Sequence, residues 1–399
     1  MDSASKELRE RKTVRGQRPP GTGAIEPPER SALTKALAIL PKRTTPQQRA
    51  GRSAARHLQL LRFAVQTTIT LLSLWIGLRF YLFVRALEQG GTEIDLSLRS
   101  PGVEAYLPIA GLIGLKHWVL SGQLNDVHPA AALFLLGALL TAVLLKKGFC
   151  GWICPIGFLS ENLRHLSLRL YGRRSWKMPR ALDYPLRSLK YLILAFFLWA
   201  ILAQMNRNVL EEFIQSPYHR VADIKMLKFF TDMSATTAYA LLGLLLLSVL
   251  VPMSWCRYLC PYGALLGALS WLSPLKIRRE EGTCIHCALC VHACPAALPV
   301  DQVATVRSDE CSGCLECVAA CPVPDTLRVA GSRRRLNLRP AVFAALVIMV
   351  FFGPVLWGRI TGRWRNSIGV EEYRRHVRNL HLPAYQHNRG RVPTPEREP

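Results

Sequence analysis

All twelve cysteines of the 399-residue chain fall into regular spacings, which indicate metal or redox chemistry. Cys150 with Cys154, and Cys256 with Cys260, form two C-x3-C-P motifs. Two C-x2-C-x2-C-x3-C-P motifs follow, with the ligand candidates Cys284, Cys287, Cys290, Cys294, Cys311, Cys314, Cys317 and Cys321. An extracellular disulfide framework gives no reason for such short, repeated spacings, and structural zinc motifs usually separate their cysteine pairs by a dozen or more residues.

The two longer motifs are typical of a pair of 4Fe-4S clusters. Three cysteines of C-x2-C-x2-C reach one cluster, whereas the fourth, before proline, reaches the other. The expected ligand sets are therefore Cys284, Cys287, Cys290 and Cys321 for the first cluster, and Cys311, Cys314, Cys317 and Cys294 for the second. Because protein ligands fill all these positions, we expect electron transfer there and no catalytic residue.

The C-x3-C-P pairs leave several interpretations open. Positions i and i+4 share one face of a helix, so the two cysteines of each pair lie together. The surrounding sequences, FCGWICPIGFLSE and WCRYLCPYGALLG, suggest two related units that meet at a membrane surface. Cys150, Cys154, Cys256 and Cys260 could hold a third metal centre or form redox-active dithiols. Alternatively, they are small packing residues beside Trp152 and Trp255.

The elements that must position these cysteines are membrane helices. The chain carries 51 Lys and Arg against 27 Asp and Glu, yet half of its residues are hydrophobic. Apolar runs alternate with Arg-rich stretches, which is the pattern of a polytopic membrane protein and excludes an ordinary soluble one. The predicted spans are 59–84, 129–147, 189–206, 233–255 and 340–358.

The distribution of Lys and Arg predicts the orientation of these spans. The segment 146–190 holds ten of them, whereas 85–128 holds three and 207–232 holds four. The positive-inside rule then places the N-terminus and both C-x3-C-P motifs in the cytoplasm. The stretch 105–115 is too short to span and suits a re-entrant or interfacial segment. The tail from 359 is expected outside despite its nine arginines.

We therefore expect an all-α polytopic membrane domain of about five transmembrane helices with an inserted small α+β ferredoxin module that holds two clusters. The predicted parts are a disordered basic segment 1–57, a membrane domain 58–255 with four spans, a cytoplasmic ferredoxin-like module 256–339, the fifth span 340–358 and a tail 359–399. The positive charge of the N-terminal segment is explained by the cytoplasmic orientation of that segment and by its attraction to anionic lipid, so no nucleic-acid partner is expected.

The chain resembles the membrane-bound polyferredoxin family typified by NapH, and the C-terminal part of NosR. The stretches that carry the resemblance are the two ferredoxin runs, PGVEAYLPIAGLIGLK at 101–116, LLKKGFCGWICPIGFLSE at 144–161 and SWCRYLCPYGALLGALSWLSPLKIRR at 254–279. The resemblance implies a multi-pass protein of the bacterial inner membrane, whose cytoplasmic cluster module exchanges electrons with the quinone pool and a partner. NosR has an outer flavin-binding domain, for which the short outer segments here leave no room.

These observations predict a membrane-bound iron-sulfur electron transfer protein. Its electrons come from quinol or a cytoplasmic donor and pass to an unidentified redox partner; donor, acceptor and direction stay open. An electron carrier is favoured over a stand-alone enzyme, which would be a quinol dehydrogenase type oxidoreductase. His117 and His128 lack a facing histidine pair and C-x-x-C-H is absent, so no haem is expected. The alternative function is an assembly factor that reduces a metal such as copper for a respiratory enzyme.

Overall fold

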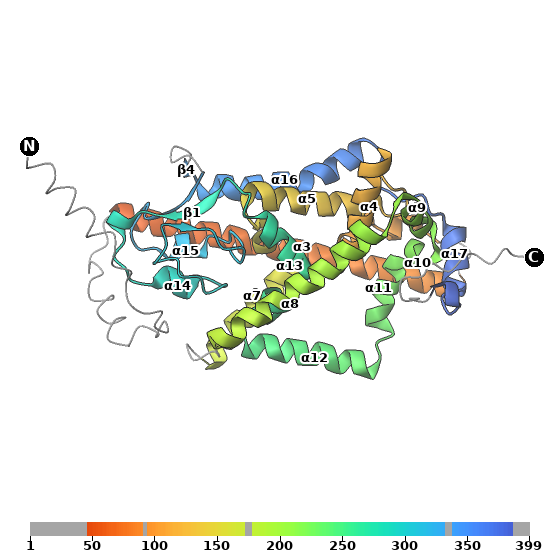
Figure 1. The fold of residues 1–399 in the computed structure, drawn as a ribbon, viewed down its shortest axis with the longest axis horizontal. Coiled ribbons are helices and arrows are strands. Elements are labelled where there is room, and N and C mark those ends of the chain that lie inside the picture. The colour runs from red at the N-terminus through yellow and green to blue at the C-terminus, as the bar shows by residue number, and fades with distance from the viewer. Residues whose placement is uncertain (1–45, 91–93, 172–177, 332–336, 386–399) are drawn as a thin grey trace, which may run out of the picture. The chain divides into compact units, whose positions relative to one another are not determined.

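The computed structural model describes residues 46–90, 94–171, 178–331 and 337–385. The part of the predicted N-terminal segment before residue 46, and the end of the tail from residue 386, lie outside the described residues. Most of the described chain is helical, and a small antiparallel sheet follows the last C-x3-C-P motif (Figure 1).

Three helical stretches among the described residues are long and apolar enough to cross a membrane. These stretches are His57–Glu88 in α3 (Pro46–Glu88), Ala181–Gln204 in α8 (Arg180–Leu198) with the π-helical turn η4 (Trp199–Gln204), and Pro340–Ile360, which is α16. Each coincides with one of the predicted spans. Helices of this length and composition support a membrane protein.

The other two predicted spans coincide with shorter helices. α5 (Pro129–Leu145) is apolar but has only 17 residues. α12 (Ala235–Leu250) meets the span criterion only together with α11 (Ala222–Thr231), from which it is bent by 82°. By length and composition, the described residues therefore supply three spans, or four if the bent pair counts as one, where the sequence predicts five.

The stretch that we expected to be re-entrant or interfacial forms part of α4 (Pro108–Ser121). Its 14 residues rise only about 21 Å, less than the ~30 Å hydrocarbon core of a bilayer. The helix ends at Gly122, which adopts a left-handed conformation with φ +73°. α4 is therefore too short to cross a bilayer.

Small residues allow α4 and α16 to pack closely on α5. A Cβ on Gly111 of α4 would lie 2.6 Å from the carbonyl oxygen of Ala131, so only glycine fits. Gly137 of α5 approaches the carbonyl oxygen of Phe351 in the same way. Figure 1 shows α5 and α16 side by side. Such contacts between small residues and backbone are typical of membrane helix pairs.

Short helices from three segments of the chain pack together, and the C-terminal tail is one of these segments. The helices are η1 (Leu96–Leu98), η2 (Pro101–Tyr106), α9 (Arg207–Gln215), α10 (Pro217–Arg220), α17 (Val370–Arg378) and η7 (Pro383–Tyr385). Arg99 forms a buried ion pair with Asp223 at 2.7 Å, and the Ser367 amide donates to the Asp126 carbonyl at 3.0 Å. The tail therefore packs on the segments that the sequence predicts to be outside.

The ferredoxin module contains a four-stranded antiparallel sheet. Its strands are β1 (Lys276–Arg279), β2 (Thr305–Val306), β3 (Leu327–Ala330) and β4 (Asn337–Leu338), in the order β2-β1-β3-β4. Ile277 of β1 pairs with Val306 and Val329, and all three side chains are buried. The helices α14 (Leu289–Ala293) and α15 (Glu316–Ala320) pack against each other. The sheet and this helix pair carry the two cysteine loops.

Candidate functional site

The first predicted ligand set lines one cavity of the module. Cys284, Cys287, Cys290 and Cys321 all contribute to its wall, although Cys321 is distant in sequence from the other three. Arg279 and Asp301 also line it. The structure thus brings together the four cysteines that the spacing assigned to one cluster.

The second predicted ligand set lines a second cavity. Its cysteines are Cys294, Cys311, Cys314 and Cys317. The remaining wall is mostly apolar and includes Ile277, Leu298, Val300 and Val306. Apolar walls limit access of water to the sulfur atoms, which is one of the ways in which a protein sets a cluster potential.

The two cysteine loops repeat the same backbone geometry at a spacing of 27 residues. Ala288 and Leu315, each two residues before the third cysteine of its run, are left-handed with φ +57° and +62°. His286 and Gly313, each one residue before the second cysteine, are left-handed as well, with φ +50° and +63°. These turns make each C-x2-C-x2-C segment wrap around a common centre.

All twelve cysteines are free thiols. Burial raises the pKa of the Cys290 thiol to about 12, and it also raises the pKa values of Cys294 and Cys321. A thiol in such surroundings stays protonated unless a positive charge replaces its proton. Bound iron supplies this charge, so the donor set fits a cluster site.

The C-x3-C-P cysteines come together from two distant parts of the chain. Cys150 lies in α6 (Gly148–Trp152), and Cys154 directly precedes α7 (Pro155–Tyr171). Cys256 lies in the π-helical turn η5 (Trp255–Leu259), and Cys260 caps α13 (Pro261–Leu269). Each of the four thiols interacts electrostatically with the other three. The two motifs therefore face each other.

Each second cysteine of these pairs accepts a backbone hydrogen bond. The Gly157 amide donates to Cys154 Sγ at 3.4 Å, and the Gly263 amide donates to Cys260 Sγ at 3.2 Å. A bond also links the two motifs, because Cys256 Sγ donates to Ser160 Oγ at 3.4 Å. Amide donors to sulfur stabilise thiolate ligands.

The first C-x3-C-P motif contacts the second ferredoxin loop. Trp152 Nε1 donates to the Gly313 carbonyl oxygen at 3.0 Å, and Trp152 is fully buried. A Cβ on Gly151 would lie 2.6 Å from the carbonyl oxygen of Ser312, so the two backbones touch. The two residues that follow Cys150 therefore touch the loop that carries Cys311 and Cys314.

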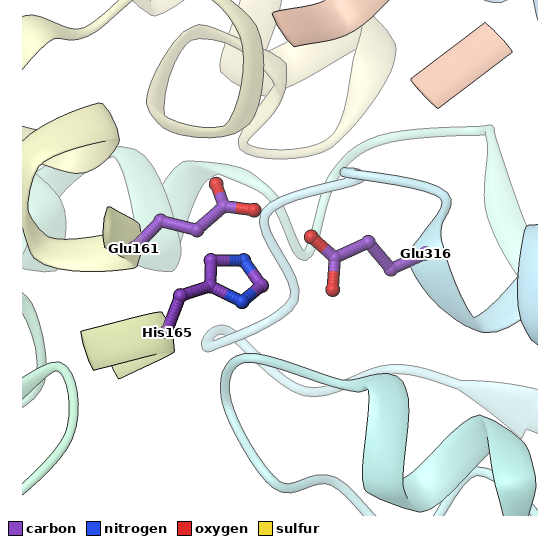
Figure 2. A group of neighbouring side chains, drawn as sticks. All are labelled: Glu161, His165 and Glu316. Atoms are coloured by element: carbon purple, nitrogen blue, oxygen red, sulfur yellow. The ribbon is translucent and has the colours of Figure 1, made fainter. Parts of the chain in front are cut away.

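A charged group next to Cys314 was not predicted. Arg62 of α3 is buried and forms ion pairs with Glu161 and Glu316, and its guanidinium also interacts with Cys314. Figure 2 shows Glu161 and His165 on one side and Glu316 on the other, with their polar ends toward one another. A single guanidinium thus bridges two carboxylates beside the second ligand set.

Lys147 is the second unpredicted charged residue. It is buried, and its Nζ lies 3.4 Å from the Asp309 carbonyl oxygen. It interacts electrostatically with Cys150 and Glu310 and with the other nearby thiols. The signals that could have revealed these residues are an arginine inside an apolar span and a lysine three residues before Cys150.

His117 and His128, which the sequence does not favour as haem ligands, lie in different surroundings. His128 is buried, and its Nε2 lies 2.8 Å from the carbonyl oxygen of His219. Its other nitrogen lies 3.5 Å from Glu104 Oε1. His117 Nδ1 lies 3.1 Å from the Gln123 carbonyl oxygen. The His219 ring lies against the His128 ring with centroids 5.0 Å apart, so the expectation that His128 has no facing histidine is wrong.

Family models match both types of cysteine motif. A model described as a 4Fe-4S binding domain matches residues 127–176 and 236–280, which contain the C-x3-C-P motifs. A model described as a 4Fe-4S dicluster domain matches residues 276–322, which contain all eight ferredoxin cysteines.

Curated relatives agree with these matches. YccM of Escherichia coli, named as a candidate electron transport protein, is 39% identical over 84% of this chain and 96% of its own length. The ferredoxin-type protein NapH of Haemophilus influenzae is 28% identical over 49% of this chain and 67% of its own. The regulatory protein NosR of Pseudomonas aeruginosa is 30% identical over 46% of this chain and 25% of its own. No solved structure matches significantly.

Proposed function

Since the chain belongs to the NapH- and YccM-like family of ferredoxin-type electron transport proteins, we propose that it carries electrons through two 4Fe-4S clusters between the quinone pool, or a cytoplasmic donor, and a redox partner protein. The observation that carries this proposal is the division of the eight ferredoxin cysteines between two cavities. Each cavity has the four cysteines that one cluster requires.

The residues of the module define what each site can do. Four thiolates fill the ligand positions of each cluster, which when bound supplies one-electron transfer. The cysteine loops hold the ligands, and the apolar wall around Cys294 and Cys317 limits water. Substrate has no open coordination position, so the protein is an electron carrier and its partner performs the chemistry.

Charges of both signs lie beside the second site: Glu316 and Glu161 disfavour added negative charge at Cys314, whereas nearby cations favour it. Arg62 interacts with Cys314, and Lys146 interacts with Cys311. A nearby cation stabilises the reduced, more negative cluster and so raises its potential. A raised potential makes exchange with quinol easier, because ferredoxin clusters of low potential lie uphill of most quinols.

The proposed topology has five spans in the bacterial inner membrane, with the N-terminus and the ferredoxin module in the cytoplasm. Contacts support this arrangement: the tail packs on segments 94–128 and 207–232, whereas Gln59 near the start of the first span donates to the Cys314 carbonyl oxygen at 3.3 Å. The two ends of the membrane domain thus contact different groups of connecting segments. α5 and α12 would each complete a crossing.

The assembly-factor alternative has one observation in its favour, which is the convergence of four thiols at the C-x3-C-P motifs. Deletion of the gene distinguishes the electron-carrier function from the assembly function. If the protein carries electrons, deletion stops electron flow to the partner enzyme while that enzyme keeps its metal cofactor. Loss of the cofactor from the partner, with restoration by added metal, would instead assign the protein to assembly.

A further inference from the structure

The two C-x3-C-P loops have the same local geometry. A Cβ on Gly157 would lie 2.5 Å from the Cys150 carbonyl oxygen and 3.6 Å from Cys154 Cβ. A Cβ on Gly263 would lie 3.7 Å from the Cys256 carbonyl oxygen and 3.6 Å from Cys260 Cβ. In each unit, the first helical turn after the proline therefore folds back over its own cysteine pair. Two such units present two thiols each.

The separation of the four sulfur atoms fits a cluster of several irons better than one ion. In the described parts of the chain, Glu161, His165 and Glu316 are the one group of three or more potential ligands whose donor atoms all lie within 4.8 Å of one another. The four thiols interact pairwise, but no three of their sulfur atoms all lie within 4.8 Å of one another. A tetrahedral ion draws sulfurs within ~2.3 Å of itself, whereas each thiolate of a 4Fe-4S cluster binds a different iron.

The eight ferredoxin cysteines behave in the same way. They line two cavities, and no three of their sulfurs form such a close group either, although every cysteine lies in the described part of the chain. The C-x3-C-P cysteines thus share with them the spread of the sulfurs and, with Cys294 and Cys321, backbone hydrogen bonds at sulfur.

The surroundings of the four thiols suit a negatively charged centre. Lys147 is buried and interacts with Cys150, Cys256 and Cys260. α7 and α13 both begin directly after the second cysteine of a pair, which directs their amide groups toward the sulfurs. Four thiolates on a 4Fe-4S core carry net negative charge, and these groups offset it.

We propose that Cys150, Cys154, Cys256 and Cys260 together hold a third 4Fe-4S cluster. The proposal rests on the proposed function in one respect, namely that the neighbouring module carries clusters with which this centre exchanges one electron at a time. Trp152 joins the centre to the second ferredoxin loop through its bond to Gly313. The third cluster would then lie between the ferredoxin module and the membrane helices α5 and α12, which precede the two motifs.

Iron counting tests the proposal directly. The full-length protein, purified without oxygen in detergent and fully loaded with iron and sulfide, should contain about 12 irons and about as many acid-labile sulfides per chain. Cys154→Ser with Cys260→Ser should lower both to about 8 and leave the ferredoxin EPR signals intact. The matched control, Cys287→Ser with Cys314→Ser, should retain about 4 irons in the third centre.

Each other outcome of the count contradicts a definite part of the account. About 8 irons in the loaded wild-type protein would overturn the third cluster and leave the two ferredoxin clusters standing. About 8 irons with one zinc or copper would assign the four thiols to a single ion. Fewer than about 8 in the wild-type protein would contradict the proposed function itself. The wild-type count decides the question even if a variant fails to fold.

Discussion

Each ferredoxin cluster depends on its own set of cysteines. Cys287 lines the first cavity and Cys314 the second, so serine at each position should remove a different cluster. We expect Cys287→Ser and Cys314→Ser each to lose about four irons per chain and to leave different EPR spectra. Identical spectra, or unchanged iron in either variant, would contradict the ligand assignment.

Arg62 should tune the second cluster. Its guanidinium interacts with Cys314 and pairs with both Glu161 and Glu316, so Arg62→Gln removes the positive charge of this group and makes the site more negative. We expect the potential of the second cluster to fall by tens of millivolts, at the order of magnitude that a partly buried charge produces. Redox titration followed by EPR measures the shift.

The matched control for Arg62→Gln is Arg79→Gln in the same helix. Arg79 is engaged with Ser97, with its Nη2 2.8 Å from the carbonyl oxygen, and that bond is exposed. The Arg79→Gln variant should leave the reduction potentials of both ferredoxin clusters unchanged. Equal shifts in the two variants would mean that general effects on α3, not local charge, set the potential.

At the residue scale, cysteine spacing was sufficient to divide the eight ferredoxin cysteines into two sets, and the cavities divide them in the same way. Spacing could not reveal Arg62 or Lys147, since each acts through the tertiary fold. Both are buried charges whose partners, Glu316 and Glu310 among them, lie far away in sequence.

Among the elements, the contact between α6 and the second ferredoxin loop should be sensitive to one methyl group. Gly151→Ala places a Cβ 2.6 Å from the Ser312 carbonyl oxygen, so the two backbones must separate. Such overpacking costs about 1–3 kcal/mol. We expect a lower thermal midpoint in detergent and slower electron exchange between the ferredoxin module and the membrane domain.

Gly353→Ala in α16 is the control for this change. A Cβ at Gly353 meets nothing within 4 Å, so this variant should be neutral or slightly stabilising. If the two alanine variants melt alike and transfer electrons alike, the contact between Gly151 and Ser312 has no importance for either property.

Hydropathy located the helices but not their ends. The apolar runs predict the cores of α3, α5, α8, α12 and α16, because a charge-poor run of suitable length is a strong signal. Helix α8 nevertheless begins at Arg180 and continues past Pro185. The 82° bend between α11 and α12 was also not predicted, since hydropathy carries no information about the angle between two helices.

For the whole molecule, the tail gives the sharpest test of topology. The Ser367 amide bonds to the Asp126 carbonyl, and Arg220 pairs with Glu372, so the tail should share a side with segments 94–128 and 207–232. Epitope tags inserted at Gly122 and after the C-terminus should be reached by antibody from outside spheroplasts. A tag at Gly282, an exposed glycine with open space around it, should be reached only after lysis.

Two results of the tag experiment would contradict the proposed topology. Access to the Gly282 tag from outside would place the ferredoxin module on the wrong side of the membrane. Protection of the C-terminal tag, with the Gly122 tag accessible, would mean that the chain crosses the bilayer an even number of times.

The central claim is that the ferredoxin clusters exchange electrons directly with the quinone pool, whereas a cytoplasmic donor is the other electron source that the proposed function allows. The most direct test uses the purified protein in anaerobic liposomes, with cluster oxidation state followed by absorbance and EPR. We predict that quinol reduces the oxidised clusters or that quinone oxidises dithionite-reduced clusters, whichever way the potentials direct the flow. Clusters that respond to dithionite and oxygen but to neither quinol nor quinone would contradict the claim.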